Sequence, residues 1–431
     1  MKWIRPAILA GLLWSSLLPI TAPAEELVLD IETAVTTALE NNLDLQVQRL
    51  ELAGLERRRR TAWNTLLPSA DARVSTSRGL LGPNAGDWEL SLGLQAGVTL
   101  AGSIASEIRG ALLDYQRGLI DLEKTGRQLE RDVRIAYYGL LLARRKIELV
   151  ERNIETSAQR YELARAGYES GRTSELEMLN ALVALENLKP KLDKERLSYE
   201  KALLGFKQDL NLEPAEEVVL TGSIDAPGGE LPQGGLATSY LPGRLDIQAL
   251  VKEREILENS RRQSALDEFA PILSLSYSYA PGLTDPWSSP WSGGDWETRS
   301  SLGLSVSIPL DVWLPSSKSR LKVREEEDDL TANALALAAR RLEAEIEIRS
   351  LLLEVENARR SAKVAGQNLM LARRVYSLTE QEYNAGVSDF LTLQEADDSL
   401  RAAQLELLTA SYDVRVGLLN LEYALNTRFK P

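Results

Sequence analysis

The chain has 431 residues, with 50 Lys and Arg against 63 Asp and Glu, and a formal net charge of −13 at pH 7. It contains no Cys and no His, which excludes disulfides, thiol nucleophiles, a lipid-anchored N-terminal cysteine and the usual ligands of zinc or copper. The acidic balance argues against nucleic acid as a partner and against general attraction to an anionic membrane.

The N-terminus has the pattern of a secretory signal peptide. Lys2 and Arg5 precede an apolar run from Ala7 to Leu18, and Ala22-Pro-Ala24 has the small-x-small pattern of a signal peptidase site. We therefore predict a signal peptide over residues 1–24, whose removal would leave a formal charge of −15 because it holds two basic and no acidic residues. No later run of 18 or more apolar residues appears, so no transmembrane helix is predicted.

The rest of the chain says nearly the same thing twice. The segment Tyr161–Gly171 returns as Tyr376–Gly386 at an offset of 215 residues, and the offset holds without a gap through two predicted helices and the turn between them. A repeat on this scale is one structural unit built twice. We predict repeat 1 over residues 25–212, a linker rich in Pro and Gly over 213–243, and repeat 2 over 244–431.

Long helices dominate the first repeat. From Val133 to Tyr168, apolar and small residues recur at alternating steps of three and four, which is a heptad seam far longer than a usual globular helix. The chain then reverses at Gly171, a predicted C-cap with positive φ, and Pro190 predicts a kink in the return helix. The elements expected here are helices at about 31–64, 103–170 and 174–211, and strands at about 70–79 and 89–100.

The second repeat has the same order. Its seam runs from Ala344 to Tyr383, and Gly386 ends the long helix. An ordinary amphipathic helix in a globular bundle is the alternative interpretation of both seams. The elements expected here are helices at about 244–268, 317–385 and 389–425, and strands at about 271–280 and 299–310.

The predicted strands alternate apolar and small polar residues with a period of two. The pattern is clearest from Leu90 to Leu100 and from Leu302 to Ile308. Strands of roughly 9–11 residues have the length that crosses a membrane when tilted. Four strands cannot close a membrane barrel, and open edges are not tolerated in lipid, so membrane insertion predicts an oligomer. A soluble sheet with one face on a core is the alternative.

At this point the mature chain resembles the TolC family of outer-membrane efflux channels. The resemblance is carried by the complete layout and by the paired turns Tyr168-Glu-Ser-Gly171 and Tyr383-Asn-Ala-Gly386 with their downstream leucines. It implies a mostly α fold with a small β part. Each copy of a homotrimer would give four strands to a twelve-stranded transmembrane β-barrel and its long helical hairpins to a periplasmic coiled-coil barrel.

The resemblance also implies a function and partners. The expected protein is a passive channel-tunnel of a tripartite efflux or type I secretion system, in the outer membrane of a Gram-negative bacterium and extending into the periplasm. Its partners would be outer-membrane lipid, a periplasmic adaptor (membrane fusion protein) and an inner-membrane transporter; it would be no enzyme and need no cofactor. The alternatives are a periplasmic coiled-coil adaptor or scaffold and, third, a secreted enzyme using Glu175 and Glu177 as an acid–base pair.

Site residues follow from the hairpin turns. The family's ring of entrance aspartates falls on Glu177, Asn180, Thr392 and Glu395, of which only the two glutamates are acidic. We predict an entrance or gate at Glu175, Glu177, Asp389 and Glu395, where crowded like charges would raise carboxylate pKa values. Solvated acids favoured by the helix dipole are the alternative. The predicted adaptor contacts are Gly171, Arg172, Thr173, Ser174, Leu176, Gly386, Val387, Ser388, Phe390 and Leu391.

Overall fold

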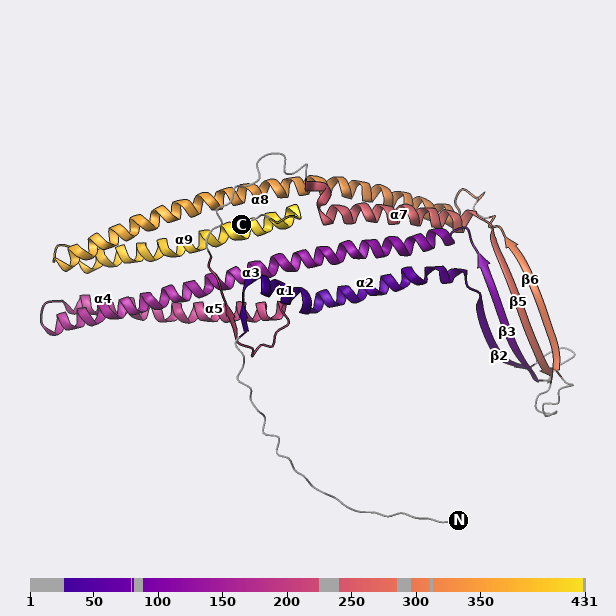
Figure 1. The fold of residues 1–431 in the computed structure, drawn as a ribbon, viewed down its shortest axis with the longest axis horizontal. Coiled ribbons are helices and arrows are strands. Elements are labelled where there is room, and N and C mark those ends of the chain that lie inside the picture. The colour runs from indigo at the N-terminus through magenta and orange to yellow at the C-terminus, as the bar shows by residue number, and fades with distance from the viewer. Residues whose placement is uncertain are drawn as a thin grey trace, which may run out of the picture.

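The structure is a computed structural model of the chain and describes residues 27–78, 80, 88–224, 240–284, 296–310 and 313–428. The molecule is a long rod of helices, with a β-sheet at one end and two helical hairpin tips at the other (Figure 1). The predicted signal peptide and the loop residues Trp287 and Trp291 lie outside the described residues.

The first repeat is built around one very long helix. This helix, α3, has 66 residues and spans about 100 Å at 1.5 Å per residue. No proline interrupts it, so its backbone hydrogen bonds continue without a break. The elements of this repeat are α1 (Ile31–Asn41), α2 (Leu43–Thr61), η1 (Ala62–Leu66), β2 (Ser69–Arg78), β3 (Trp88–Leu100), α3 (Ile104–Glu169), α4 (Glu175–Glu186) and α5 (Leu188–Asp209).

The second repeat has the same order around the 67-residue helix α8. Its return helix packs closely on α8, because a Cβ at Gly417 would come within 2.9 Å of Val355 Cγ2. The elements of this repeat are η2 (Leu241–Gly243), α7 (Leu245–Phe269), β5 (Ile272–Thr284), β6 (Trp296–Ser307), α8 (Lys318–Asn384) and α9 (Phe390–Leu425).

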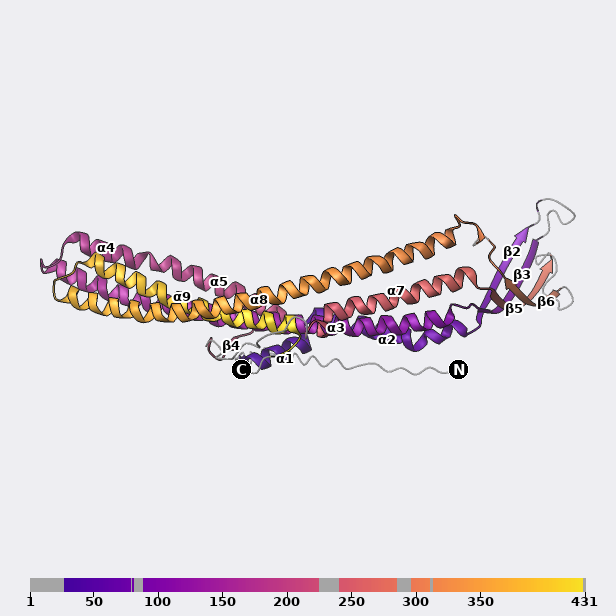
Figure 2. The same cartoon turned by 90° about the horizontal axis from the view of Figure 1, so that it is seen from above.

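The helices lie side by side, and their order differs between the two halves of the rod (Figures 1 and 2). In the half next to the sheet, α2 contacts α3, α3 contacts α7 and α7 contacts α8. In the other half, α4 and α5 contact α3, α3 contacts α9 and α9 contacts α8. The helix α8 is therefore one edge of the copy along its whole length, while α2 and the α4–α5 pair form the opposite edge.

The helix predicted over 31–64 is divided, and the division is a correction to the sequence analysis. Asn42 is non-helical, with φ −57° and ψ 127°, and its side-chain oxygen accepts a hydrogen bond from Leu45 N at 3.1 Å. This is the N-cap geometry in which a short polar side chain satisfies a free backbone N–H of a new helix. The Asn42 amide also donates to Asp209 O at 3.0 Å, which ties the break to the end of α5.

The first return helix is divided as well, three residues before Pro190. The helix α4 ends at Glu186 and α5 begins at Leu188, so Pro190 falls in the first turn of α5. Proline is tolerated there because its missing N–H has no partner in a first turn, whereas inside a helix its ring clashes with the carbonyl four residues earlier. The predicted irregularity is thus present, but it is a break at Asn187.

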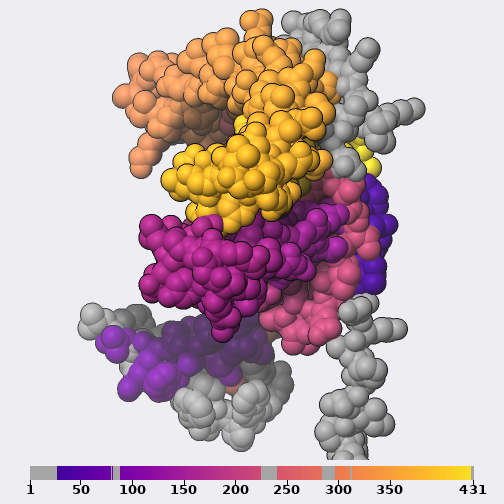
Figure 3. All heavy atoms as spheres, turned by 90° about the vertical axis from the view of Figure 1, so that its left-hand side faces the viewer, coloured from indigo at the N-terminus to yellow at the C-terminus, as the bar shows by residue number. Residues whose placement is uncertain are grey.

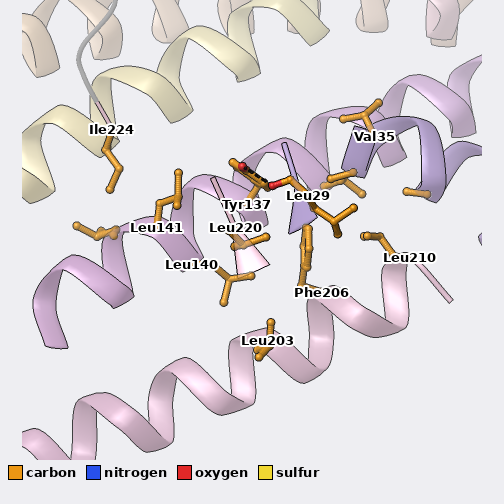
Figure 4. Close-up of a cluster of buried hydrophobic side chains, with 14 residues drawn as sticks. Leu29, Val35, Tyr137, Leu140, Leu141, Leu203, Phe206, Leu210, Leu220 and Ile224 are labelled. Atoms are coloured by element: carbon orange, nitrogen blue, oxygen red, sulfur yellow. Dashed lines mark hydrogen bonds between the residues drawn. The ribbon is translucent and has the colours of Figure 1, made fainter. Parts of the chain in front are cut away.

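The main hydrophobic core lies near the middle of the rod and includes two strands that the sequence analysis did not predict. The strands β1 (Leu27–Leu29) and β4 (Val218–Leu220) pair in parallel, and β4 lies within the predicted linker. Leu29, Leu220, Phe206 and Tyr137 pack together here (Figure 4). The Tyr137 hydroxyl lies within hydrogen-bond distance of Leu29 O, at 3.1 Å, and of the backbone oxygen of Thr221. The linker is therefore part of the fold at this level.

Candidate functional site

Glycine closes each hairpin tip. Gly171 has φ +71° and Gly386 has φ +74°, a region that side chains rarely adopt. The turns are alike in their hydrogen bonds: Arg172 N donates to Gly167 O at 2.8 Å, and Val387 N donates to Glu382 O at 2.9 Å. These are the backbone hydrogen bonds by which a left-handed residue ends a helix, so both predicted C-caps are present.

A polar side chain caps the helix that leaves each tip. Ser174 Oγ accepts from Glu177 N at 3.2 Å, and Asp389 Oδ1 accepts from Thr392 N at 2.8 Å and from Thr392 Oγ1 at 2.7 Å. These bonds from Thr392 lower the pKa of Asp389. For Asp389 this direction is the opposite of the one that crowding predicts, since the capping bonds favour the charged form.

The predicted gate residues do not gather in a single copy. Glu175 and Glu395 are exposed, and Asp389 caps α9. Glu177 alone bridges the two hairpins, because its Oε1 accepts a hydrogen bond from the Tyr383 hydroxyl at 2.7 Å. Burial raises the pKa of Tyr383, and the hydrogen bond to Glu177 and its negative charge raise it further, to about 12. The hydroxyl therefore keeps its proton, and this bridge is present, throughout the neutral range.

A larger polar network, missed by the sequence analysis, joins the hairpins a few turns above the tips. Arg160 donates to Asp397 at 2.8 Å and to the Tyr376 hydroxyl at 2.7 Å. Arg401 also pairs with Asp397 and donates to Ser157 Oγ at 3.1 Å. Asp397 is only 6% exposed, so its charge depends on these two arginines. The available signal was an acidic residue among the apolar positions of α9.

The predicted adaptor residues lie at the free end of the rod, which Figure 3 views end-on. Leu176, Val387 and Leu391 are 68%, 79% and 61% exposed, as few large apolar side chains are in this chain. Thr173 instead packs on Gly167, and Phe390 lies against the Tyr383 ring at 6.3 Å between centroids. Gly171, Arg172, Ser174, Gly386 and Ser388 complete the two turns.

At the other end of the rod, the four strands form one sheet in the order β2-β3-β5-β6. The register places Leu94 beside Tyr279 and Leu275 beside Leu304, so that apolar side chains share one face. The other face carries small polar residues, where Ser75 and Ser91 are joined at 2.8 Å, as are Ser278 and Ser301. Leu304 is 70% exposed, and within a single copy nothing covers the apolar face there.

Two searches of the described residues were negative. None of the described helices is both long enough and apolar enough to cross a membrane. Among the same residues, no group of three or more acidic side chains is arranged to hold a metal ion.

A rod of doubled helical hairpins that carries a sheet with one apolar face defines a class of protein, the outer-membrane efflux channels. The family model for outer membrane efflux proteins matches residues 34–209 and 240–427, and the chain belongs to this family. It is therefore an outer-membrane protein of a Gram-negative bacterium that extends into the periplasm, and the predicted recognition, fold class and location are confirmed. The adaptor and enzyme alternatives are not retained.

Relatives with curated names share less than a quarter of their residues with the chain. The probable efflux pump outer membrane protein TtgC of Pseudomonas putida is 24% identical over 418 residues, covering 92% of this chain and 82% of the relative. Nodulation protein T of Rhizobium leguminosarum bv. trifolii is 22% identical over 425 residues, covering 92% and 85%.

Solved structures show the same fold. CusC superposes with a TM-score of 0.79 at 18% identity and covers 99% of each chain. The open state of the MtrE outer membrane channel of Neisseria gonorrhoeae gives a TM-score of 0.77 at 20% identity, covering 92% of this chain and 89% of that one.

Proposed function

We propose that three copies of this chain form the outer-membrane duct of a tripartite efflux system, and that solutes cross it passively. The observation that carries the proposal is the sheet, which has one apolar face, one face of serine and glycine, and two unpaired edges, β2 and β6. Lipid does not tolerate unpaired strand edges, and a barrel closes at about eight strands or more. Three copies supply twelve strands, with the small polar face lining a wet pore.

Passive conduction fits what the chain contains. In its described part no acidic cluster is arranged to hold a metal, and the pore face of the sheet is lined by hydroxyls and glycine rather than by a binding pocket. A wide polar duct selects mainly by size. The same duct could serve type I secretion, but relatives named as efflux pump components favour efflux.

The hairpin tips are the proposed periplasmic entrance and the contact with the adaptor. The exposed leucine and valine side chains at Leu176, Val387 and Leu391 offer an apolar surface to an adaptor's helical hairpin. A Val387→Asp variant should lose co-purification with the adaptor, since burying an unpaired charge in that contact is costly. Undiminished co-purification would place the contact elsewhere.

The bond between Tyr383 and Glu177 is the proposed latch of the entrance. It is the direct bond between the predicted gate residues and the other hairpin, and it joins α8 to the first turn of α4. A half-exposed hydrogen bond to a carboxylate is worth about 1 kcal/mol, so its loss should raise the open-to-closed ratio roughly fivefold for each latch. Glu175, Asp389 and Glu395 belong to the proposed entrance only if they meet between copies.

The test is single-channel conductance of the detergent-extracted protein in planar bilayers. Tyr383→Phe should lengthen or multiply open events. The matched control is Tyr168→Phe, because Tyr168 is the counterpart of Tyr383 in the first repeat and is 42% exposed. Equal records for the two variants would remove the latch.

The native mass of the wild-type protein, corrected for bound detergent, tests the duct itself. A trimer is expected. A stable monomer from the membrane fraction would leave strand edges unpaired in lipid and would overturn the proposed function.

A further inference from the structure

The contact between α3 and α9 inside one copy is built from polar and charged side chains. Arg131 lies over the Tyr423 ring at 4.3 Å, and Arg415 lies over the Tyr138 ring at 4.9 Å. Nearer the tips, the contact continues through the ion pair of Arg160 with Asp397, described above. We call this contact, between hairpin 1 and hairpin 2 of the same copy, the internal seam.

The internal repeat makes this seam a template for a second one. Adding the offset of 215 residues moves each position of α3 onto α8, and subtracting it moves each position of α9 onto α4 or α5. The edges thus generated, α8 and α4–α5, are the two opposite edges of a single copy. A ring of repeats closes only if these edges meet, each on the neighbouring copy.

The residues at the second seam differ in chemistry from those at the first. The α3 residues Arg131, Tyr138 and Arg160 correspond to Ile346, Leu353 and Val375 of α8. These three apolar side chains are 59%, 63% and 54% exposed in a single copy. Polar positions of the internal seam have therefore become an apolar stripe on the outer edge, at the spacing of one helix face.

The opposite edge carries a matching stripe. Tyr138 contacts Arg415, whose counterpart on α5 is Glu200, and Glu200 lies between Leu197 and Leu204. Asp397 corresponds to Leu182, which adjoins Val183 on α4. Leu197, Leu204 and Val183 are 56%, 50% and 58% exposed.

We propose that the α8 stripe packs on the α4–α5 stripe of a second copy of this chain, in the register that the internal seam dictates. Leu353 then lies between the neighbour's Leu197 and Leu204, and Val375 lies against the neighbour's Leu182 and Val183. Knob-like packing of this kind is what heptad seams form. The inference rests on the ring of the proposed function and names the residues that close it.

Charge at the margin of this seam agrees with the register. Arg401 corresponds to Glu186 on α4, and Ser157 corresponds to Ala372 on α8. Arg373 and Arg374, which follow Ala372, are exposed and form no ion pair with any described residue of their own copy. The register brings them within a turn of the neighbour's Glu186.

The chemical difference between the seams has a consequence for assembly. Two seams related by a repeat have similar geometry, so hairpin 2 could in principle pack on the wrong hairpin 1. An apolar stripe opposite the Arg160–Asp397 pair would leave buried charge without a partner, which is strongly unfavourable. The polar seam therefore keeps the two hairpins of one copy together, and the apolar seam is left for the neighbour.

Cysteine crosslinking tests the register without background, because the chain contains no cysteine. The double variants are Leu204→Cys with Leu353→Cys, and Val183→Cys with Val375→Cys, treated in membranes with a short bis-maleimide. Each should yield covalent dimers and trimers on denaturing gels, while the single variants should not. The mismatched pair Val183→Cys with Leu353→Cys should also fail, since its sites lie roughly 30 Å apart along the seam at 1.5 Å per residue.

A pair across the internal seam, Tyr138→Cys with Arg415→Cys, provides the converse control and should crosslink within one chain at monomer mobility. If both matched pairs gave only monomers while the native mass of the same variants remained that of a trimer, the register would be wrong and the ring would stand. Monomeric wild-type protein would instead overturn the ring. Crosslinking of the mismatched pair as efficient as that of the matched pairs would also overturn the register.

Discussion

At the scale of single residues, two glycines set the shape of the tips. Gly171 and Gly386 have positive φ, and no atom lies within 4 Å of a Cβ built on either. An alanine would therefore meet no clash and would cost only backbone strain, about 1 kcal/mol. We expect Gly386→Ala and Gly171→Ala each to lower the midpoint of thermal unfolding in detergent.

Gly205 is the matched control for this prediction. It lies exposed within α5, and a Cβ there also meets nothing within 4 Å, but its φ is helical. Alanine should stabilise that helix by up to about 1 kcal/mol, so the two kinds of variant should shift the midpoint in opposite directions. A rise for Gly386→Ala would mean that its turn does not need the left-handed conformation.

At the scale of elements, an ion-pair network holds the start of α7 against α8. Arg244 pairs with Asp246 at 2.9 Å and with Glu347 at 2.8 Å, and Arg340 reaches Asp246 at 2.6 Å. Arg244 is 5% exposed and also donates to Ala424 O of α9, at 3.2 Å. Burial alone would raise the pKa of Asp246, but hydrogen bonds and charge from the two arginines outweigh it and lower the pKa to about 2.

This network predicts a pH dependence of stability. A depressed pKa means that the stabilisation is complete above the ordinary value of 3.8 and is lost as pH falls towards 2. Asp246→Asn should cost about 3 kcal/mol at neutral pH, because it leaves two arginines short of a partner, and should flatten the acid limb of unfolding. Glu343→Gln is the control: Glu343 is an exposed partner of Arg340 at 3.1 Å, so its loss should cost under about 1 kcal/mol. Equal costs for the two variants would contradict this account.

At the scale of the whole molecule, the two faces of the sheet decide insertion. Leu304 lies on the apolar face and Ser305, its neighbour in β6, on the polar face. An arginine on the lipid side of a barrel costs roughly 2–4 kcal/mol near the bilayer centre, whereas one facing the lumen is tolerated. Leu304→Arg should reduce the amount of heat-modifiable oligomer recovered from outer membranes, and Ser305→Arg should not. The reverse result would place the apolar face towards the pore.

The sequence by itself determined the features that depend on neighbours along the chain. Heptad spacing, period-two strands, the glycines of the tips and the repeat offset all follow from residues a few positions apart or from comparing two segments, and the fold class and location could be inferred from them. Single-residue interruptions were harder, because Asn42 acts as a cap only where the chain turns to meet Asp209 O. The three-residue strands β1 and β4 carry too few residues for a periodic signal.

Only the tertiary structure decided which side chains meet across the rod. Arg160 and Asp397 are 237 residues apart, and Tyr383 and Glu177 are 206 apart. Nothing in local propensity links such positions, since their contact depends on how two hairpins pack and at which register. For the same reason the sequence could place four acids near the tips but not show that one caps a helix, one bridges the hairpins and two remain exposed. Periodicity selects the faces of the helices, and packing selects their partners.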